Sequence, residues 1–494
     1  MIREVGFDNE KYLELQSKYI KERIDKFSGK LYLELGGKLF DDFHASRVLP
    51  GFEPDSKMKM LLNLKECSEI VIAISAVDIE KNKIRGDLGI SYDTDLLRLI
   101  DSFSSVGLFV SSVVITKYAG QYAADVFKKK LENLGLNVYL HYVIDGYPNN
   151  IPFIVSKAGY GRNEYIETTR PLVIVTAPGP GSGKLATCLS QLYHEHKRGV
   201  TAGYAKFETF PIWNLPLKHP VNLAYEAATA DLNDLNMIDP YHLEAYGEMT
   251  VNYNRDVEAF PLLKAILEQI LGESPYQSPT DMGVNMVGNC IVNNDIVCEA
   301  AKQEIVRRYY KVLCDKLMGR VSESAVIKAD SIMKQAGVSL AERSVVKPAL
   351  NKAETSGKHA VAIELDNGVI VTGKSSELLG SVSAAMLNAM KVMADIEDDV
   401  PLLAQSFIEP IVKLKRETFR SKNSHLDSHE MLIALSSSAV VNPQASKALE
   451  KISRLRGCEL HSSVMLNDTD EMVLKKLGIN YTCEPVRRNK NLYH

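Results

Sequence analysis

The sequence predicts an α/β protein with a doubly wound, mostly parallel N-terminal sheet carrying a P-loop-like turn, a helical middle module and a C-terminal α/β subdomain. Short apolar, β-branched runs alternate with amphipathic helical patterns over residues 1–220, which is typical of a parallel sheet. Long helical patterns then fill residues 221–353. A hairpin signal, Asp366-Asn367-Gly368 between two apolar runs, indicates a third region over residues 354–494.

Composition places the chain among ordinary globular proteins. Its 494 residues exceed one typical domain, and its 45% hydrophobic and 24% charged residues are average values. A net charge of −4 without a basic stripe predicts no nucleic-acid partner. The longest apolar runs, such as 106–115, are far shorter than the ~20 residues that a membrane span needs, so no membrane association is expected.

The sequence also indicates a compartment. The N-terminus carries acidic residues and begins a polar helix, so we expect no signal peptide. The seven cysteines include no C-x-x-C pair and are interpreted as reduced thiols, which favours the cytoplasm. The oligomeric state stays open, with a homo-oligomer among the options.

Strands of the N-terminal sheet alternate with helices. We expect strands at 31–35, 70–77, 106–115, 137–143, 172–175 and 202–207, and helices at 7–27, 93–103, 120–134 and from about Ser182. Ligands of such sheets bind at the carboxyl ends of strands, where Gly36, Asp78, Asp145 and Gly179 fall. We interpret Asp78 and Asp145 as loop-initiating or capping residues.

The middle and C-terminal regions are predicted mainly from helical periodicity. Helices are expected at 221–232, 256–271, 294–317, 322–335, 340–353, 377–395, 401–415, 428–436 and 444–455, with strands at 359–365 and 369–372 and near Glu459 and Tyr481. The hairpin-then-helix start of the C-terminal region resembles the deaminase-like superfold. The zinc motif of the deaminases, H-x-E with P-C-x-x-C, is absent, so that chemistry is not expected here.

A glycine-rich turn follows the predicted strand 172–175. The sequence T-A-P-G-P-G-S-G-K at 176–184 places a helix start and a lysine directly after glycines, an arrangement that favours anion binding. The predicted phosphate-binding residues here are Gly179, Gly181, Ser182, Gly183 and Lys184. The P-loop pattern G-x-x-x-x-G-K-S/T fails at Pro178 and at Leu185, so Mg²⁺ is doubtful. The alternative is a tight strand-to-helix turn with a solvated lysine.

A second polar loop follows the predicted strand 31–35. Its sequence, G-G-K-L-F-D-D-F-H-A-S-R at 36–47, adds Gly36, Gly37, Lys38 and Ser46 as predicted phosphate-binding residues. His44 and Arg47 are the candidate catalytic residues, because histidine titrates near neutral pH and arginine can clamp a phosphoryl group. The alternative is a surface loop whose polar groups only satisfy the backbone.

No metal site is predicted. His425 and His429 are four residues apart, as in helical zinc sites, but the sequence H-L-D-S-H-E lacks the H-E-x-x-H motif. Ser424, Asp427 and Ser428 are interpreted as N-cap residues of the next helix.

Two long blocks carry a resemblance to a known family. G-G-K-L-F-D-D-F-H-A-S-R-V-L-P-G-F-E-P-D at 36–55 and T-A-P-G-P-G-S-G-K-L-A-T at 176–187 resemble the bacterial family catalogued as domain of unknown function 1846. The resemblance covers essentially the whole chain. It implies an N-terminal α/β domain, a helical insert and a C-terminal deaminase-like subdomain, but it implies no substrate and no catalytic residues.

The sequence therefore leads to a function hypothesis with two rivals. We predict a protein that binds a phosphorylated small molecule or a nucleotide at the glycine turn, with phosphoryl transfer as the reaction class; any cofactor stays unknown, a nucleotide being the candidate. The alternative is a non-catalytic regulator that binds a nucleotide or phosphometabolite, which the missing Mg²⁺ ligand at Leu185 favours. A third reading is a scaffold in which both glycine loops are structural.

Overall fold

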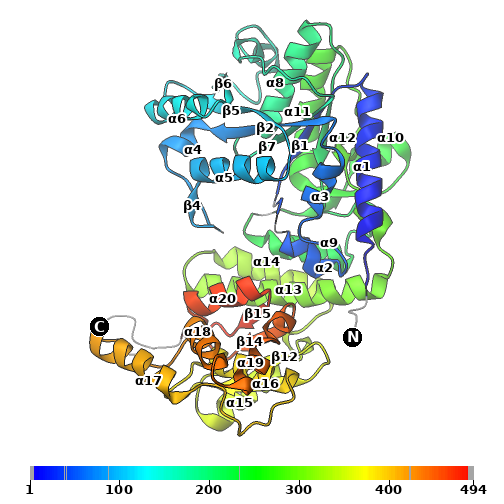
Figure 1. The fold of residues 1–494 in the computed structure, drawn as a ribbon. Coiled ribbons are helices and arrows are strands. Elements are labelled where there is room, and N and C mark those ends of the chain that lie inside the picture. Colours follow the sequence, from blue (N-terminus) through cyan, green and yellow to red (C-terminus); the bar gives the residue numbers. More distant parts are fainter. Residues whose placement is uncertain are drawn as a thin grey trace. The chain divides into compact units, whose positions relative to one another are not determined.

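The computed structural model describes residues 5–37, 39–40, 42–86, 88–232, 234–421 and 424–487. These residues form two compact units. The first is built from the chain up to residue 226 together with residues 234–301, and the second from residues 227–232 and from residue 302 onward. Each unit has its own sheet (Figure 1).

The first unit contains a seven-stranded sheet in the order β11-β8-β1-β7-β2-β5-β6. Every neighbouring pair in it is parallel. The strands are β1 (Leu31–Leu35), β2 (Ser68–Ser75), β5 (Val110–Tyr118), β6 (Asn137–Tyr142), β7 (Leu172–Thr176), β8 (Gly203–Phe207) and β11 (Gly283–Val284). The prediction of an α/β protein with a large parallel sheet is confirmed.

Continuous apolar strands explain why this sheet is central. All residues of β2 and β7 are buried, which a parallel sheet achieves when helices cover both of its faces. The helices of this unit are α1 (Asn9–Lys26), α2 (Phe43–Val48), α3 (Ser56–Asn63), α4 (Ala76–Glu80), α5 (Tyr92–Ser105), α6 (Tyr122–Asn133), α7 (Ile151–Ile154), α8 (Lys184–Lys197), α9 (Pro220–Ala228), α10 (Pro240–Tyr246), α11 (Asn254–Leu271) and α12 (Pro279–Met282).

Several predicted boundaries shift in the structure. Helix α8 begins at Lys184, because Gly183 adopts a left-handed conformation that ends the turn. Strand β2 ends at Ser75, so Asp78 lies inside the short helix α4 and does not end a strand. Sequence patterning also missed the small antiparallel pairs β3 (Ile84–Arg85) with β4 (Ile90–Ser91) and β9 (Asn236–Ile238) with β10 (Val251–Tyr253).

The order of the strands creates a switch point between β1 and β7. From β1 the chain continues to β2 on one side, whereas from β7 it continues through α8 to β8 on the other side. The two connections therefore leave neighbouring strands toward opposite edges of the sheet. In open α/β sheets, ligands bind at such a point, outside the carboxyl ends of the strands.

The second unit contains a four-stranded sheet in the order β13-β12-β14-β15. Strands β12 (Ala360–Glu364) and β13 (Ile370–Lys374) form the predicted antiparallel hairpin, whereas β14 (Glu459–Ser462) and β15 (Asn480–Cys483) pair in parallel. Its helices are α14 (Glu323–Ala336), α15 (Val346–Ser356), α16 (Ser381–Met393), α17 (Gln405–Lys413), α18 (Ser428–Ala439), α19 (Pro443–Leu449), α20 (Asp468–Leu477) and most of α13 (Asn294–Leu317). Region 221–353 is largely helical but also supplies β9, β10 and β11, and the predicted three-domain division stays a prediction.

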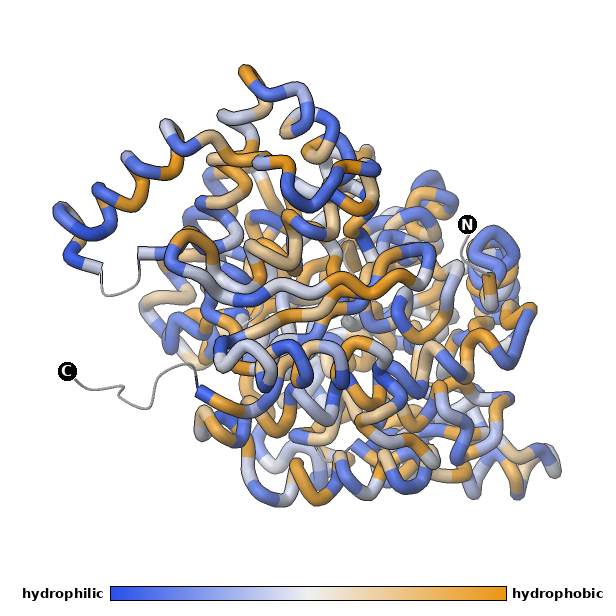
Figure 2. Tube along the Cα trace, turned by 90° about the horizontal axis from the view of Figure 1, so that it is seen from below, coloured by the Kyte–Doolittle hydropathy of each residue, from blue (hydrophilic) through white to orange (hydrophobic). Residues whose placement is uncertain are grey.

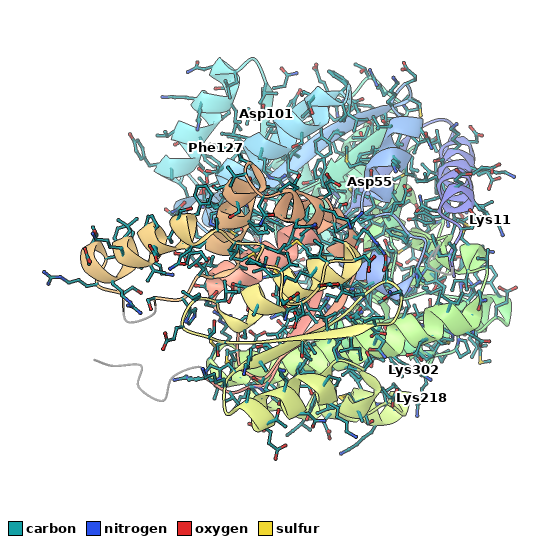
Figure 3. The ribbon with its side chains drawn as sticks, turned by 60° about the horizontal axis from the view of Figure 1, so that its bottom comes forward. Lys11, Asp55, Asp101, Phe127, Lys218 and Lys302 are labelled. Carbon is teal, nitrogen blue, oxygen red and sulfur yellow. The ribbon has the colours of Figure 1, made fainter. Side chains whose placement is uncertain are left out.

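The surface is of mixed character. Hydrophobic and hydrophilic residues alternate at short intervals along the helices, so a helix can bury one side and expose the other (Figure 2). Lys11 on α1, Asp101 on α5 and Lys218 are exposed charges of opposite sign (Figure 3). None of the helices in the described residues is both long enough and apolar enough to cross a bilayer.

Candidate functional site at the carboxyl edge of the parallel sheet

The structure brings the first glycine loop and the glycine turn together. The residue after β1 is Gly36, and a Cβ atom placed on it would lie 3.9 Å from Cε of Lys184, the first residue of α8. The Nζ atom of Lys184 is also 3.8 Å from Oε1 of Glu34, a residue of β1. Two segments separated widely in sequence therefore meet at the switch point between β1 and β7.

The glycine turn needs glycine at two positions. Gly181 and Gly183 have φ angles of +79° and +90°, which side-chain-bearing residues rarely adopt. A Cβ atom on Gly183 would also lie 2.9 Å from Oγ1 of Thr116 on β5, so the turn packs closely on a strand two positions away from β7 in the sheet. Hydrogen bonds hold its carbonyl groups, since Thr116 Oγ1 donates to Ser182 O (2.7 Å) and Lys117 Nζ donates to Gly181 O (2.9 Å).

Unlike the carbonyl groups, the backbone N–H groups of the turn lack hydrogen-bond partners in the part of the chain that the structure describes. Among the described residues, no hydrogen-bond acceptor meets the N–H groups of residues 181–186. Such N–H groups, at the start of a helix whose dipole adds partial positive charge, are suited to an anion. The Ser182 hydroxyl is already engaged, because the buried side chain donates to Gly179 O at 2.9 Å.

The second predicted loop leads into α2. Asp42 caps this helix by accepting a hydrogen bond from Ala45 N, and it also pairs with Lys57 at 2.8 Å. Ser46, a predicted phosphate ligand, donates its hydroxyl to Phe43 O at 3.2 Å. Lys57 Nζ lies 3.4 Å from the Cβ position of Gly37, so this buried cation supports the loop after β1.

The candidate catalytic residues lie on α2 itself. The ring of His44 packs edge-on against Phe210 and Tyr225, with centroids 5.2 and 5.9 Å apart. Arg47 follows in the last turn of this helix. Lys38 lies outside the described residues. The roles assigned to His44, Arg47 and Lys38 stay predictions.

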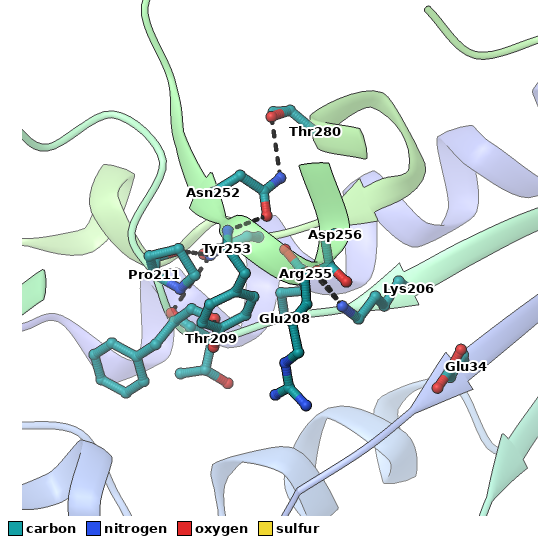
Figure 4. Close-up of polar contacts among 12 residues, drawn as sticks. Glu34, Lys206, Glu208, Thr209, Pro211, Asn252, Tyr253, Arg255, Asp256 and Thr280 are labelled. Carbon is teal, nitrogen blue, oxygen red and sulfur yellow. Dashed lines mark hydrogen bonds and ion pairs between the residues drawn. The ribbon is translucent and has the colours of Figure 1, made fainter. Parts of the chain in front are cut away.

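A cluster of charged residues that the sequence did not reveal lies beside Lys184 and Glu34. Lys206, on β8, forms an ion pair with Glu208 at 3.1 Å and contacts Asp256 in the first turn of α11 (Figure 4). Glu34 is the register partner of Lys206 across β1 and β8. The Tyr204 hydroxyl donates to Glu34 at 2.9 Å. One ammonium group thus has three carboxylates around it.

Glu208 is held in place by its neighbours. It follows the carboxyl end of β8, and its backbone N–H donates to Val284 O of the adjacent β11 at 3.1 Å. The indole N–H of Trp213 donates to Oε2 of Glu208 at 3.1 Å. Trp213 in turn fits against Gly283, where an added Cβ atom would lie 2.4 Å from the indole ring. The position of the carboxyl group is therefore fixed from two sides.

Burial and charge set the protonation of this cluster. Burial raises the pKa of Glu208 to about 7; the Lys206 ammonium opposes this rise, whereas Asp256 adds to it. Burial alone would lower the pKa of Lys206, but Glu208, Asp256 and Glu34 together hold it above its ordinary value. Lys206 is therefore a stable cation, and Glu208 is a carboxyl group that exchanges a proton near neutral pH.

Sequence patterning offered only weak signals for this cluster. Glu34 is a charge inside the apolar strand L-Y-L-E-L, and K-F-E at 206–208 ends another strand. Both positions break a buried run, which is unusual unless the charge has a partner. The contact with Asp256, fifty residues beyond Lys206 in the chain, could not be predicted from spacing.

The donor set does not indicate a metal centre. Within the residues that the structure describes, no group of three or more His, Cys, Asp or Glu side chains has the geometry to hold a metal ion. His425 and His429 are separated by Asp427, the N-cap of α18, which forms a capping box with Glu430. Of the predicted N-cap residues Ser424, Asp427 and Ser428, only Asp427 has this role, and Ser428 is the first residue of the helix.

Comparison with known proteins gives the family. The model for the N-terminal part of domain of unknown function DUF1846 matches residues 5–337, and that for its C-terminal part matches residues 341–493. The chain belongs to the DUF1846 family. It is also 56% identical over 492 residues to a UPF0371 protein of Streptococcus pneumoniae strain JJA, and 56% identical to that of strain CGSP14, with 100% of each chain covered. The resemblance predicted from the two sequence blocks is confirmed.

Proposed function

We propose that this DUF1846 protein binds a phosphorylated small molecule or a nucleotide at the switch point between β1 and β7. The proposal rests on a helix N-terminus that coincides with a lysine. The N–H groups of residues 181–186 have no hydrogen-bond acceptor among the described residues, and the side chain of Lys184 lies beside them. Gly181 leaves open space beside this backbone, whereas Gly179 and Gly183 let the turn pack against Tyr92 and Thr116. In this sense the turn is P-loop-like.

The residues around the turn shape what it can hold. Gly36 and Gly37 follow β1 without side chains, and Glu34 is 3.8 Å from Lys184. A bound phosphate group would compete with Glu34 for the lysine, so a weakly bound inorganic phosphate is expected. Affinity for a full ligand would then come from contacts beyond the phosphate group.

Two kinds of function fit this site. Phosphoryl transfer would use Arg47 and His44 from α2 as clamp and proton carrier. A non-catalytic regulator is favoured by one observation: Leu185 occupies the position of the P-loop hydroxyl, and the nearby Thr187 is fully buried and so cannot supply it. We place either function in the cytoplasm, which agrees with the seven cysteines, all described and none in a disulfide. The likeness of the C-terminal sheet to deaminase-like proteins stays a prediction and has no role in this proposal.

Thermal unfolding in the presence of phosphate compounds tests the proposal. A ligand that binds only the folded protein adds about 2.7 kcal/mol at 100 times its Kd. We expect inorganic phosphate, sugar phosphates or nucleotides to raise the Tm of the wild type and not that of Lys184→Ala. Lys197→Ala is the matched control, because it removes a lysine from the other end of α8. The proposal fails if none of these compounds raises the Tm of the wild type, or if Lys184→Ala responds like Lys197→Ala.

Measurements with and without Mg²⁺, followed by turnover assays on the compound that binds, separate the two functions. An enzyme consumes the compound, whereas a regulator leaves it unchanged and binds it without the metal.

A further inference from the structure

The cluster around Lys206 lies one strand beyond β1, on the side away from the glycine turn. Strands β7, β1 and β8 are consecutive in the sheet, and neighbouring strands are 4.7–4.9 Å apart, so the carboxyl ends of β7 and β8 are about 10 Å apart. This is roughly the length of a phosphorylated sugar. Gly36 follows the strand between them and adds no side chain of its own, whereas the Lys184 side chain passes close to it and reaches to 3.8 Å from Glu34.

The two ends of this path differ in charge. The glycine turn offers N–H groups and Lys184 to an anion, whereas the β8 end carries Glu208 and Asp256 around a single Lys206. Glu34, on β1 between the two ends, lies 3.8 Å from Lys184. A second phosphate group at the β8 end would face these carboxylates and be repelled. Alternating ammonium and carboxylate groups instead suit hydroxyl groups, which both donate and accept hydrogen bonds.

The β8 end is also reachable in part. The side chains of Lys206 and Asp256 are 31% and 27% exposed, whereas that of Glu208 is only 4% exposed. A ligand hydroxyl that contacts the exposed part of Lys206 would thus lie next to Glu208, which is the more deeply buried of the two side chains. The groups that face Glu208 are Lys206 on the preceding strand β8, Asp256 and Tyr253 at the start of α11, Glu34 on β1 by way of Lys206, and the Trp213 indole.

We propose that Glu208 is a proton-transfer residue acting on the non-phosphate end of a sugar or polyol monophosphate bound across β7, β1 and β8. This rests on the proposed phosphate site. The Glu208 carboxylate takes the proton of a ligand hydroxyl: the ligand O–H bond breaks, the proton passes to a Glu208 oxygen, and the electron pair stays on the ligand oxygen. The Lys206 ammonium stabilises that negative oxygen, and the reverse step returns the proton. A raised pKa of Glu208 suits this exchange near neutral pH.

Calorimetric titration with four probes tests the inference: inorganic phosphate, ribose 5-phosphate, fructose 6-phosphate and fructose 1,6-bisphosphate. We expect at least one sugar monophosphate to bind at least tenfold more tightly than inorganic phosphate, and the bisphosphate to bind more weakly than fructose 6-phosphate. In Glu208→Gln, the affinity for that monophosphate should fall at least tenfold. The proton uptake or release that accompanies binding, measured in buffers of different ionisation enthalpy, should vanish in this variant. The affinity of Glu208→Gln for inorganic phosphate should change less than twofold.

Two further variants show whether a negative result concerns the phosphate site or the role of Glu208. Glu69→Gln is the matched control, because Glu69 is a buried glutamate that accepts hydrogen bonds from Thr169 N and Arg170 N at the amino end of β2. Lys184→Ala should weaken all four probes; if it weakens none, the proposed phosphate site is wrong. If Lys184→Ala weakens binding but Glu208→Gln behaves like Glu69→Gln, or no sugar monophosphate exceeds inorganic phosphate, the present inference alone is overturned.

A measurement on the wild type does not depend on the folding of any variant. In protein labelled with ¹³C at the glutamate carboxyl, the resonance that is absent from Glu208→Gln should titrate near pH 7 and shift when the monophosphate binds. A midpoint near the ordinary value of 4.5, or no response to any sugar monophosphate, would overturn the assignment.

Discussion

Each of the two units contains a partly buried cluster of charged side chains, and the two clusters differ in their ratio of acidic to basic groups. In the first unit, Lys206 faces Glu34, Glu208 and Asp256, and Lys184 adds a second cation 3.8 Å from Glu34. In the second unit, Arg307 and Arg343 share the carboxylate of Glu459, and Arg307 also pairs with Glu304 at 2.8 Å. One cluster has an excess of acid, whereas the other has an excess of cations, because Arg308 also pairs with Glu304 at 2.8 Å and three arginines thus surround two glutamates.

The arginine cluster has the geometry of a structural element. Arg307 donates to both oxygens of Glu459 at 3.0 Å, and Arg343 donates to Oε2 of Glu459 and to Leu460 O at 2.9 and 3.2 Å. The Asn480 amide adds a hydrogen bond to Glu459 at 3.0 Å. Burial alone would raise the pKa of Glu459, but Arg307 and Arg343 hold it below its ordinary value. Every oxygen of this carboxylate thus has a partner.

A charge that stabilises the fold and a charge that serves a ligand differ in how their protonation is set. A buried carboxylate whose oxygens all accept hydrogen bonds from arginines is held in its charged form, as the lowered pKa of Glu459 indicates. An acid with a raised pKa at the carboxyl edge of a parallel sheet is instead unfavourable for the folded state and is typical of functional sites. Glu459 belongs to the first kind and Glu208 to the second.

Replacing the central glutamate of each cluster by glutamine should give the largest difference. Glu459→Gln leaves Arg307 and Arg343 without their anion, and we expect the free energy of unfolding to fall by about 4 kcal/mol. Glu208→Gln keeps the hydrogen bond from Trp213 and relieves repulsion with Asp256, so its free energy of unfolding at pH 7 should be unchanged or higher. Urea denaturation followed by circular dichroism measures both. Equal losses of unfolding free energy in the two variants would contradict the distinction between Glu459 and Glu208.

The contributions of Glu208 and Glu459 to the free energy of unfolding should change with pH in opposite directions. We expect these changes to be somewhat smaller than the loss predicted for Glu459→Gln. The folded pKa of Glu208, about 7, lies above its ordinary value of 4.5, so its contribution is present below pH 4.5 and is lost as the pH rises to 7. The loss is on the order of 3 kcal/mol by the conversion of pKa differences into free energy. The folded pKa of Glu459 is lowered, so its contribution is present above pH 4.5 and is lost as the pH falls.

Subtracting each variant from the wild type isolates these contributions. The difference in free energy of unfolding between wild type and Glu208→Gln should decline between pH 4.5 and pH 7, and that for Glu459→Gln should decline below pH 4.5. A flat difference for Glu208→Gln across the first range would place that residue with Glu459 as a structural charge.

More of the parallel sheet than of the candidate site could be predicted from the sequence. Apolar runs such as β2 and β7 predicted the parallel sheet, because full burial leaves a continuous hydrophobic pattern. Glycines before Lys184 predicted the turn, since a positive φ angle is a local requirement. The approach of Lys184 to Glu34, and of Lys206 to Asp256, depends on strand order and register, which no local pattern encodes.

We expect an anion to bind between the carboxyl ends of β1 and β7. A crystal of the protein soaked in tungstate, a phosphate analogue whose heavy atom is located by anomalous scattering, tests this binding. We predict a peak beside the N–H groups of residues 181–186 and Nζ of Lys184, and no such peak in Lys184→Ala. A peak only at other places, or a wild type that holds no tungstate at this edge, would contradict the claim.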